Sequence, residues 1–215
     1  YFICLVVSIS CVLCPVQSKL DDDVHLLRDA LGGLTTELSK WKETSDSFFQ
    51  RSLELINDNK KKAAQKALTS YLENYPQGAN HLQVEFLSAE LYFQDENWSA
   101  ASEQYASVLE QPTHEYTEQA LVRITQAMVN NEQKSAALPY WKTLEELAQF
   151  QENKRYALFN LMQLYYEQEQ FSDAIAYAEK VVVLRSLGQK IKWDAYRVLA
   201  RSAVTLQDVN KAAKA

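Results

Sequence analysis

The sequence predicts an all-α protein, built as an α-solenoid of about five helical hairpins and preceded by a short helix with a heptad pattern. Three observations predict this fold. Only four Gly and four Pro occur among 215 residues, which leaves little material for β-hairpins or disordered linkers. Helical stretches alternate with short polar breaks. One pattern of small and large residues recurs with a period near 37 residues, which is typical of a solenoid.

The first eighteen residues contain an uncharged apolar run with the length of a signal-peptide core. Val16 and Ser18 supply the small residues that precede a cleavage site, so cleavage is expected before Lys19. We therefore expect residues 1–18 to be a signal peptide, truncated at its start, and the protein to be exported. The alternatives are lipid attachment at Cys11, an uncleaved anchor, or a buried helix. Membrane association is expected only with lipidation or an uncleaved segment.

Residues 19–47 are expected to form an amphipathic, coiled-coil-like segment. Gly32 and Gly33 fall on its outer face, where each costs a helix about 1 kcal/mol. The segment is therefore either a short coiled coil, through which chains would self-associate, or two helices broken at the glycines. Apolar residues step by four and three along its other face, with a miss at Ser45: Leu20, Val24, Leu27, Leu31, Leu34, Leu38, Trp41 and Phe48.

Residues 48–215 carry the repeated pattern. A small residue opens the second helix of each hairpin, at separations of 37, 36, 37 and 38 residues: Ala64, Ala101, Ala137, Ala174 and Ala212. Further residues of the expected core follow four and seven positions later, on the same helical face. In the first four hairpins these are Leu68, Tyr71, Tyr105, Val108, Trp141, Leu144, Ala178 and Val181. The fifth hairpin stops within its second helix, so the repeat domain is expected to be incomplete at the C-terminus.

Two kinds of break alternate along the repeats, which predicts pairs of antiparallel helices. One kind is rich in Asn, Asp, Gln and Glu and lacks glycine: 57–59, 95–97, 130–132, 168–170 and 207–208. The other kind contains Pro, Gly or Asn: 76–78, 111–113, 152–153 and 187–188. Arg51 and Glu85 are charged residues at expected core positions, and they weaken the pattern of the first two hairpins.

The hairpins resemble the tetratricopeptide repeat (TPR), which has small-x2-Tyr and Ala-x3-aromatic marks. The motif that carries the resemblance is Ala89-x2-Tyr92 followed by Ala101-x3-Tyr105. The resemblance covers residues 48–215 and implies a right-handed α-solenoid that binds proteins or peptides. The heptad segment and the export signal resemble the bacterial envelope branch of this family. Its parallels are the periplasmic Tol-Pal-associated division coordinator and the lipoprotein that helps assemble outer-membrane β-barrels, which implies a periplasmic or outer-membrane-associated location.

By this resemblance, the first helix of each hairpin lines a concave surface that binds the partner. Amide and guanidinium groups on that surface can bond the backbone or carboxylates of an extended peptide, and Phe and Tyr supply contact area. The pattern of the family places twelve residues there: Phe86, Glu90, Phe93, Arg123, Gln126, Asn130, Tyr156, Asn160, Gln163, Tyr166, Arg197 and Arg201.

No catalytic, cofactor or metal site is expected. His25, His81 and His114 are far apart, and the chain has no HExxH, Walker or GxGxxG motif. A net charge of −6 and the absence of a Lys/Arg stripe argue against a nucleic-acid partner. The sequence therefore predicts a non-catalytic interaction scaffold of the cell envelope. The alternative is an oligomerising spacer in which residues 19–47 join the chains.

Overall fold

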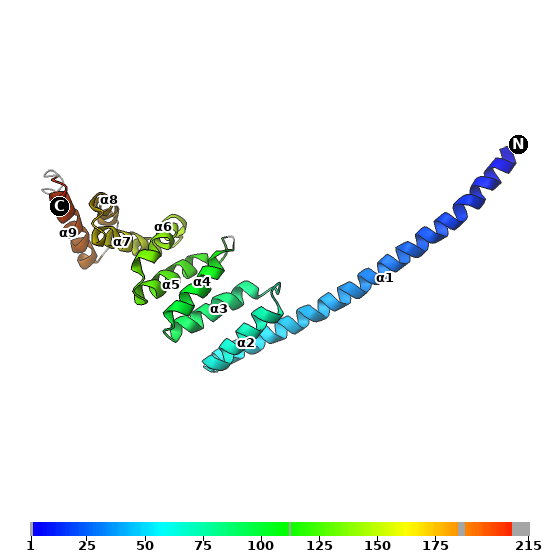
Figure 1. Ribbon diagram of the computed structural model, residues 1–215, viewed down its shortest axis with the longest axis horizontal. Helices are drawn as coiled ribbons and strands as arrows, with labels where there is room; N and C mark the ends of the chain where they lie inside the picture. Colours follow the sequence, from blue (N-terminus) through cyan, green and yellow to red (C-terminus); the bar gives the residue numbers. More distant parts are fainter. Residues whose placement is uncertain (1, 112, 185–187, 208–215) are drawn as a thin grey trace.

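All regular secondary structure in the described residues is helical, and consecutive helices pack against each other (Figure 1). This computed structural model describes the backbone of residues 2–111, 113–184 and 188–207, and side chains from residue 23 on except at position 43. The all-α solenoid predicted from the sequence is confirmed. The elements are α1 (Phe2–Asn57), α2 (Lys61–Asn74), α3 (His81–Gln94), α4 (Trp98–Leu109), α5 (Thr117–Asn130), the 3-10 helix η1 (Lys134–Ala137), α6 (Leu138–Leu147), α7 (Gln151–Glu167), α8 (Phe171–Val182) and α9 (Gln189–Thr205).

Helix α1 is one continuous helix of 56 residues that projects far beyond the other helices (Figure 1). It runs through Gly32 and Gly33 unbroken, so of the two alternatives the one with two helices broken at the glycines is wrong. A Cβ added at either glycine would meet nothing within 4 Å, in keeping with their position on the outer face. The heptad-patterned segment is also not a separate short helix. It continues past residue 47 into the last turns of α1, which pack on α2 as the first hairpin.

The other hairpins follow the predicted pairing. Helices α3 and α4 form the second hairpin, α5 and α6 the third, and α7 and α8 the fourth. In the third, η1 leads into α6, where Pro139 occupies the first turn and needs no backbone partner there. Helix α9 is the first helix of the fifth hairpin. The second helix expected around Ala212 lies outside the described residues.

The glycine-free turns within the hairpins share one backbone geometry. Each contains one residue with a left-handed backbone, with φ between 55° and 60°: Asn59, Glu96, Glu132, Glu169 and Gln207. In the second hairpin the Glu96 N–H donates to the Phe93 carbonyl at 3.1 Å, and the next N–H, of Asn97, donates to the Tyr92 carbonyl at 2.9 Å. This is the Schellman arrangement, which satisfies the last carbonyls of the helix. It recurs in the first, third and fourth hairpins.

The predicted core positions of the first four hairpins are all fully buried. The opening alanines of the second helices have no exposed surface, and neither do the residues four and seven positions later. Alanine at the first position lets the two helices approach closely, and the larger residues fill the space beyond it. The twelve residues are Ala64, Leu68, Tyr71, Ala101, Tyr105, Val108, Ala137, Trp141, Leu144, Ala174, Ala178 and Val181.

The two charged residues expected in the core differ from each other. Glu85 is buried, and its carboxylate accepts hydrogen bonds from Ser107 Oγ at 2.9 Å and Gln111 Nε2 at 3.2 Å. These donors offset the cost of burying the charge. Arg51 is exposed, so its predicted core position is wrong. Only one face of α1 packs on the array, and Ser52, which is fully buried, lies on that face instead.

Candidate functional site

The surface formed by the first helices of the hairpins is the candidate partner-binding site. Helix α3 contacts α5, and α7 contacts α9, so the two helices of each of these pairs lie side by side. We define the first-helix face by eleven of the twelve predicted residues: Glu90, Phe93, Arg123, Gln126, Asn130, Tyr156, Asn160, Gln163, Tyr166, Arg197 and Arg201. The twelfth, Phe86, is placed differently by the structure.

Phe86 lies in the core, so its prediction as a binding-surface residue is corrected. Its side chain is only 6% exposed. Its ring stacks on Tyr116, with centroids 4.8 Å apart, and meets Tyr105 edge-on at 5.9 Å. Tyr116 belongs to the connection before α5, and it covers a position that the repeat pattern would leave open.

Four predicted residues from two hairpins form one cluster on the first-helix face. The Glu90 Oε1 atom accepts a hydrogen bond from Arg123 Nε at 3.1 Å. The Arg123 guanidinium also donates to Gln126 Oε1 at 3.3 Å and lies 4.8 Å from the centroid of the Phe93 ring. Arg123 keeps about a third of its side chain exposed. The cluster therefore holds the guanidinium group in a fixed position on a side chain that is partly exposed.

Tyr105, a fully buried core residue, contacts this cluster. The Tyr105 hydroxyl donates to the same Glu90 oxygen at 2.7 Å. Burial raises the pKa of Tyr105, and the hydrogen bond to Glu90 and the charge of that carboxylate raise it further. The phenol therefore stays protonated and remains a donor to Glu90. Glu90 is thus tied both to its own hairpin and to α5 of the next one.

Helix α7 contributes aromatic and amide side chains that are half-buried. The Tyr156 hydroxyl lies 3.3 Å from Thr125 Oγ1, which links α7 to α5. Asn160 donates from Nδ2 to the Tyr156 carbonyl at 2.8 Å, and the Tyr166 ring lies 6.1 Å from the Phe171 ring. Gln163 is half-buried on the same helix. These four side chains therefore pack partly against neighbouring residues and keep the rest of their surface exposed to a ligand.

Helix α9 presents a more exposed and more basic stretch. Arg197 and Arg201 are both exposed, and Arg197 pairs with Asp194 at 2.7 Å. Trp193 lies one helical turn before Arg197 and is 75% exposed, yet the sequence prediction did not include it. Its spacing of four residues from Arg197 was the available signal. Asn130, at the end of α5, is also exposed.

A cleft of about 570 Å³ lies beside Arg123, between α5, the α6–α7 connection and the start of α7. Glu118 of α5 accepts three hydrogen bonds there, from the backbone N–H groups of Gln149 and Phe150 at 3.0 and 3.1 Å and from Asn153 Nδ2 at 2.8 Å. Its carboxylate is therefore occupied in joining the third and fourth hairpins. No local sequence pattern indicates the role of Glu118, because its partners lie 31 to 35 residues away.

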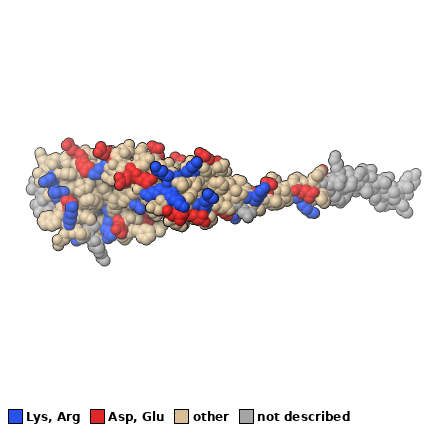
Figure 2. Space-filling model, turned by 90° about the horizontal axis from the view of Figure 1, so that it is seen from below, with Lys and Arg blue, Asp and Glu red and all other residues tan. Residues whose placement is uncertain are grey.

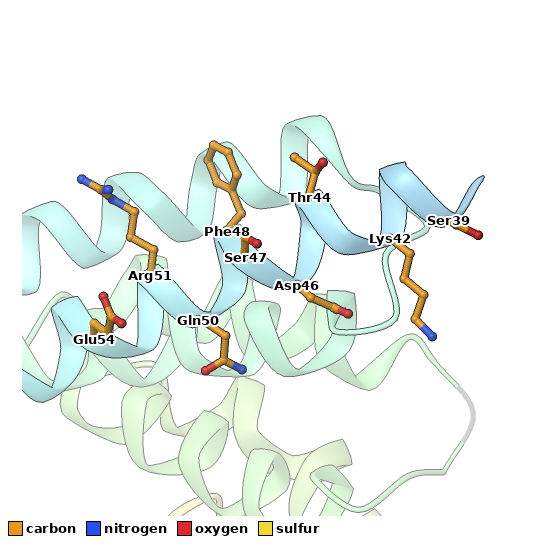
Figure 3. Close-up of a pocket in the computed structure, with 9 residues that line it drawn as sticks. All are labelled: Ser39, Lys42, Thr44, Asp46, Ser47, Phe48, Gln50, Arg51 and Glu54. Carbon is orange, nitrogen blue, oxygen red and sulfur yellow. The ribbon is translucent and has the colours of Figure 1, made fainter. Parts of the chain in front are cut away.

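A broader hollow lies along α1, but its polar side chains do not point toward a common centre. Figure 3 shows that Phe48 and Thr44 point to one side of the helix, while Lys42, Asp46 and Gln50 point to the other. All of its lining residues come from this one helix: Ser39, Lys42, Thr44, Asp46, Ser47, Phe48, Gln50, Arg51 and Glu54. The hollow is open and does not bring catalytic groups together.

The surface of the array carries charges of both signs. On the face seen in Figure 2, basic and acidic residues are interspersed along the array and along the projecting helix. Among the described residues, no three His, Cys, Asp or Glu side chains are grouped so that they could hold a metal ion. Within the same residues, no helix is both long enough and apolar enough to cross a membrane.

Comparison with known proteins gives matches in structure. No protein-family model matches the chain, and no curated protein matches it. YrrB, described as a TPR protein with an unusual peptide-binding site, has a TM-score of 0.56 and 18% identity over 77% of this chain and 79% of its own. A tetratricopeptide repeat protein from Parabacteroides merdae has a TM-score of 0.58 and 13% identity over 79% of this chain and 63% of its own. MamA from Desulfovibrio magneticus has a TM-score of 0.54 and 18% identity over 79% of this chain and 89% of its own.

At these identities the likeness concerns the fold. It agrees with the buried alanine positions, the paired helices and the repeated left-handed turns described above. The chain is therefore similar to TPR proteins in its architecture, and its fold is a tetratricopeptide-repeat solenoid.

Proposed function

We propose that the protein is a non-catalytic scaffold that binds segments of partner proteins on the first-helix face. The observation that carries this proposal is the cluster around Arg123, whose guanidinium is held by Glu90 and Gln126 while about a third of the side chain stays exposed. A preorganised donor of this kind loses little freedom when it binds a ligand. The peptide-binding site reported for YrrB is in keeping with this class of ligand, although it belongs to a different protein.

The chemistry of the face favours an extended segment with carboxylate groups and some apolar side chains. Helix α9 carries four basic residues, at positions 190, 192, 197 and 201, against one acidic residue, Asp194. Arginine binds carboxylates in a bidentate geometry, and the amides of Asn160 and Gln163 can bond a peptide backbone. Tyr156, Tyr166 and the exposed Trp193 supply contact area. An acidic segment would therefore find partners along the length of the face.

The test compares two triple variants in pull-down from the native organism, followed by peptide binding. The combination Arg123→Ala, Asn160→Ala and Arg197→Ala removes three groups of the first-helix face and should lose the partner. The control combination Lys66→Ala, Glu103→Ala and Glu146→Ala changes three exposed residues on second helices and should keep it. Circular dichroism checks that both variants fold. If the first variant retained every partner, binding through this face would be wrong.

We also propose that the scaffold is exported and works in the cell envelope. The support is the uncharged apolar run within residues 1–18 and the small residues before Lys19. Mass spectrometry of the protein recovered from its own cells tests this directly. A mature chain beginning at Lys19 is expected. A chain that retains residues 1–18 and is found in the cytoplasm would reject export, and a lipid on Cys11 would indicate anchoring instead.

A second candidate function is self-association through α1. The observation that favours it is the row of exposed apolar residues between Val24 and Leu38, which no other part of the described chain covers. Exposed contiguous apolar surface of this kind marks an interaction site. Light scattering should show a multimer that becomes a monomer when residues 19–38 are deleted. This deletion spares Trp41, which packs on Tyr75 with ring centroids 5.5 Å apart. A monomeric intact protein would reject the candidate.

A further inference from the structure

We propose that two copies of the chain pair through α1 in parallel and in register, so that both repeat arrays lie at the same end of the paired helices. This inference rests on the second candidate function, self-association, and adds the partner and its orientation. It does not depend on ligand binding by the first-helix face. Two independent features of α1 carry it, namely the apolar seam and the charges that flank the seam.

The apolar seam follows the heptad positions a and d. Val24, Leu31 and Leu38 fall at a, and Leu27 and Leu34 fall at d. Val24 is 47% exposed, and the four leucines are each between 61% and 67% exposed. From Val24 to Leu38 the seam extends over about 21 Å of helix. Leucines exposed in an unbroken heptad row indicate a helix that lacks its partner.

The seam ends where α1 joins the repeat array. The next d position is Trp41, whose ring packs edge-on against Tyr75 of the same chain. The next a position is Ser45, which is fully buried. The array therefore covers the a and d positions from Trp41 on, so the core positions open to a second copy end at Leu38, whereas Lys42 at a flanking e position stays exposed. Gly32 and Gly33 fall at the outer b and c positions, so they leave the seam uninterrupted.

The flanking charges select the orientation. Asp23 and Glu37 occupy g positions, and Arg28 and Lys42 occupy e positions. In a parallel pair in register, each g residue faces the e residue five positions later on the other helix. Asp23 then faces Arg28, and Glu37 faces Lys42, on both sides of the pair. All four residues are exposed, and none of them has an ion-pair partner among the described residues of its own chain.

An antiparallel pair would not use these charges in the same way. It places g against g and e against e. Between residues 23 and 42, every charged g residue is acidic and every charged e residue is basic. Like charges would then face each other wherever charged positions met, and like charges across a helical interface are destabilising. The distribution of charge is therefore complementary in the parallel arrangement alone.

Parallel pairing would place two first-helix faces at one end of the assembly. A partner that carries two copies of its binding segment could then engage both arrays. The second contact would be intramolecular, so the overall affinity would exceed that of one array. The seam is short, and pairing is expected to be reversible and dependent on protein concentration.

Disulfide trapping tests the orientation. In the full chain, with Cys4, Cys11 and Cys14 changed to Ser, Leu27→Cys and Leu34→Cys are made separately. Both are d positions, and both should form covalent dimers on mild oxidation, because a parallel pair in register brings identical residues together. Gly33→Cys, on the outer face, is the matched control and should form few. Trapping at only one d position would overturn the parallel register.

Charge exchange provides the second arm of the test. Glu37→Lys replaces two attractive contacts with two repulsive ones and should raise the dissociation constant about tenfold by analytical ultracentrifugation. Adding Lys42→Glu restores the pairs with exchanged signs and should return the constant to its original value. If the double variant stayed as weak as Glu37→Lys, the inference would fail while self-association stood. An intact protein that is monomeric at every concentration would reject both.

Discussion

Leu31 in α1 and Leu68 in α2 both lie on the apolar face of a helix, yet Leu31 is 61% exposed and Leu68 is fully buried. Leu68 packs in a cluster that its own chain supplies, together with Tyr71 and Phe49. No described part of the chain packs on Leu31. Apolar periodicity therefore has two different meanings in this molecule. In the repeat array it stabilises the fold of one chain, and in α1 it contributes stability only if a second chain covers it.

The largest expected effect is the loss of stability when a core residue of the array is truncated, compared with an exposed apolar residue of α1. Trp141 is fully buried in the core shared by the third and fourth hairpins, and Trp141→Ala should lower the free energy of unfolding of the array by about 3–5 kcal/mol. Leu31→Ala should change it by less than about 0.5 kcal/mol, because the side chain is already exposed. Urea denaturation of both variants measures the difference. Equal losses at the two sites would mean that α1 packs on the array.

A smaller effect is expected where two hairpins are joined by a polar contact. Glu118→Ala leaves the N–H groups of Gln149 and Phe150 without their acceptor and frees Asn153, and should cost about 2 kcal/mol. Glu146→Ala in the adjacent α6 changes an exposed carboxylate and is the control. Hydrogen exchange should show faster opening of the α6–α7 connection in the first variant only. Unchanged exchange there would mean that water replaces the carboxylate at no cost.

The core of the array was predictable from the sequence, whereas parts of the site were not. The alanine positions and their partners four and seven residues later follow from helical geometry, which depends only on spacing within one helix. Phe86 was misplaced because Tyr116, thirty residues away, covers it. The partners of Glu118 are equally distant, and no local pattern indicates them. The heptad helix also continues into the first hairpin. It passes both glycines without a break, because no neighbouring group packs against either position.

Alkaline pH should weaken the array through Tyr105, which is fully buried, and Tyr177, which is half-buried. Burial is the first cause that raises the pKa of Tyr105 and of Tyr177, and neighbouring carboxylates raise both further. The folded state therefore holds these protons more tightly than the unfolded state, whose tyrosines ionise near pH 10. Stability is fully present below about pH 10. Above it Tyr105 costs about 1.4 kcal/mol per pH unit until its folded pKa is reached, and the half-buried Tyr177 costs less because solvent screens its charge.

The pH dependence of urea denaturation between neutral and strongly alkaline solution measures this effect. Tyr105→Phe should reduce the slope above pH 10, because it removes a group that holds its proton more tightly in the folded state, and should also lose the hydrogen bond to Glu90 at every pH. Tyr196→Phe, an exposed tyrosine of α9 with the same chemical change, is the control. A slope that Tyr105→Phe did not alter would show that Tyr105 ionises equally in both states.

The smallest expected effects concern glycine. The left-handed turns favour glycine but lack it, whereas α1 contains two glycines although glycine disfavours a helix. Glu96, Glu132 and Glu169 hold left-handed backbones, so changing each to Gly should add about 0.5–1 kcal/mol to the stability of the array. Gly32→Ala and Gly33→Ala should each stabilise α1 by about 1 kcal/mol without touching the array, because their Cβ atoms meet nothing. Circular dichroism and ultracentrifugation would then distinguish two cases. Tighter self-association with increased helicity means that pairing and folding of α1 are coupled, whereas unchanged association means that the helix is already complete in the single chain.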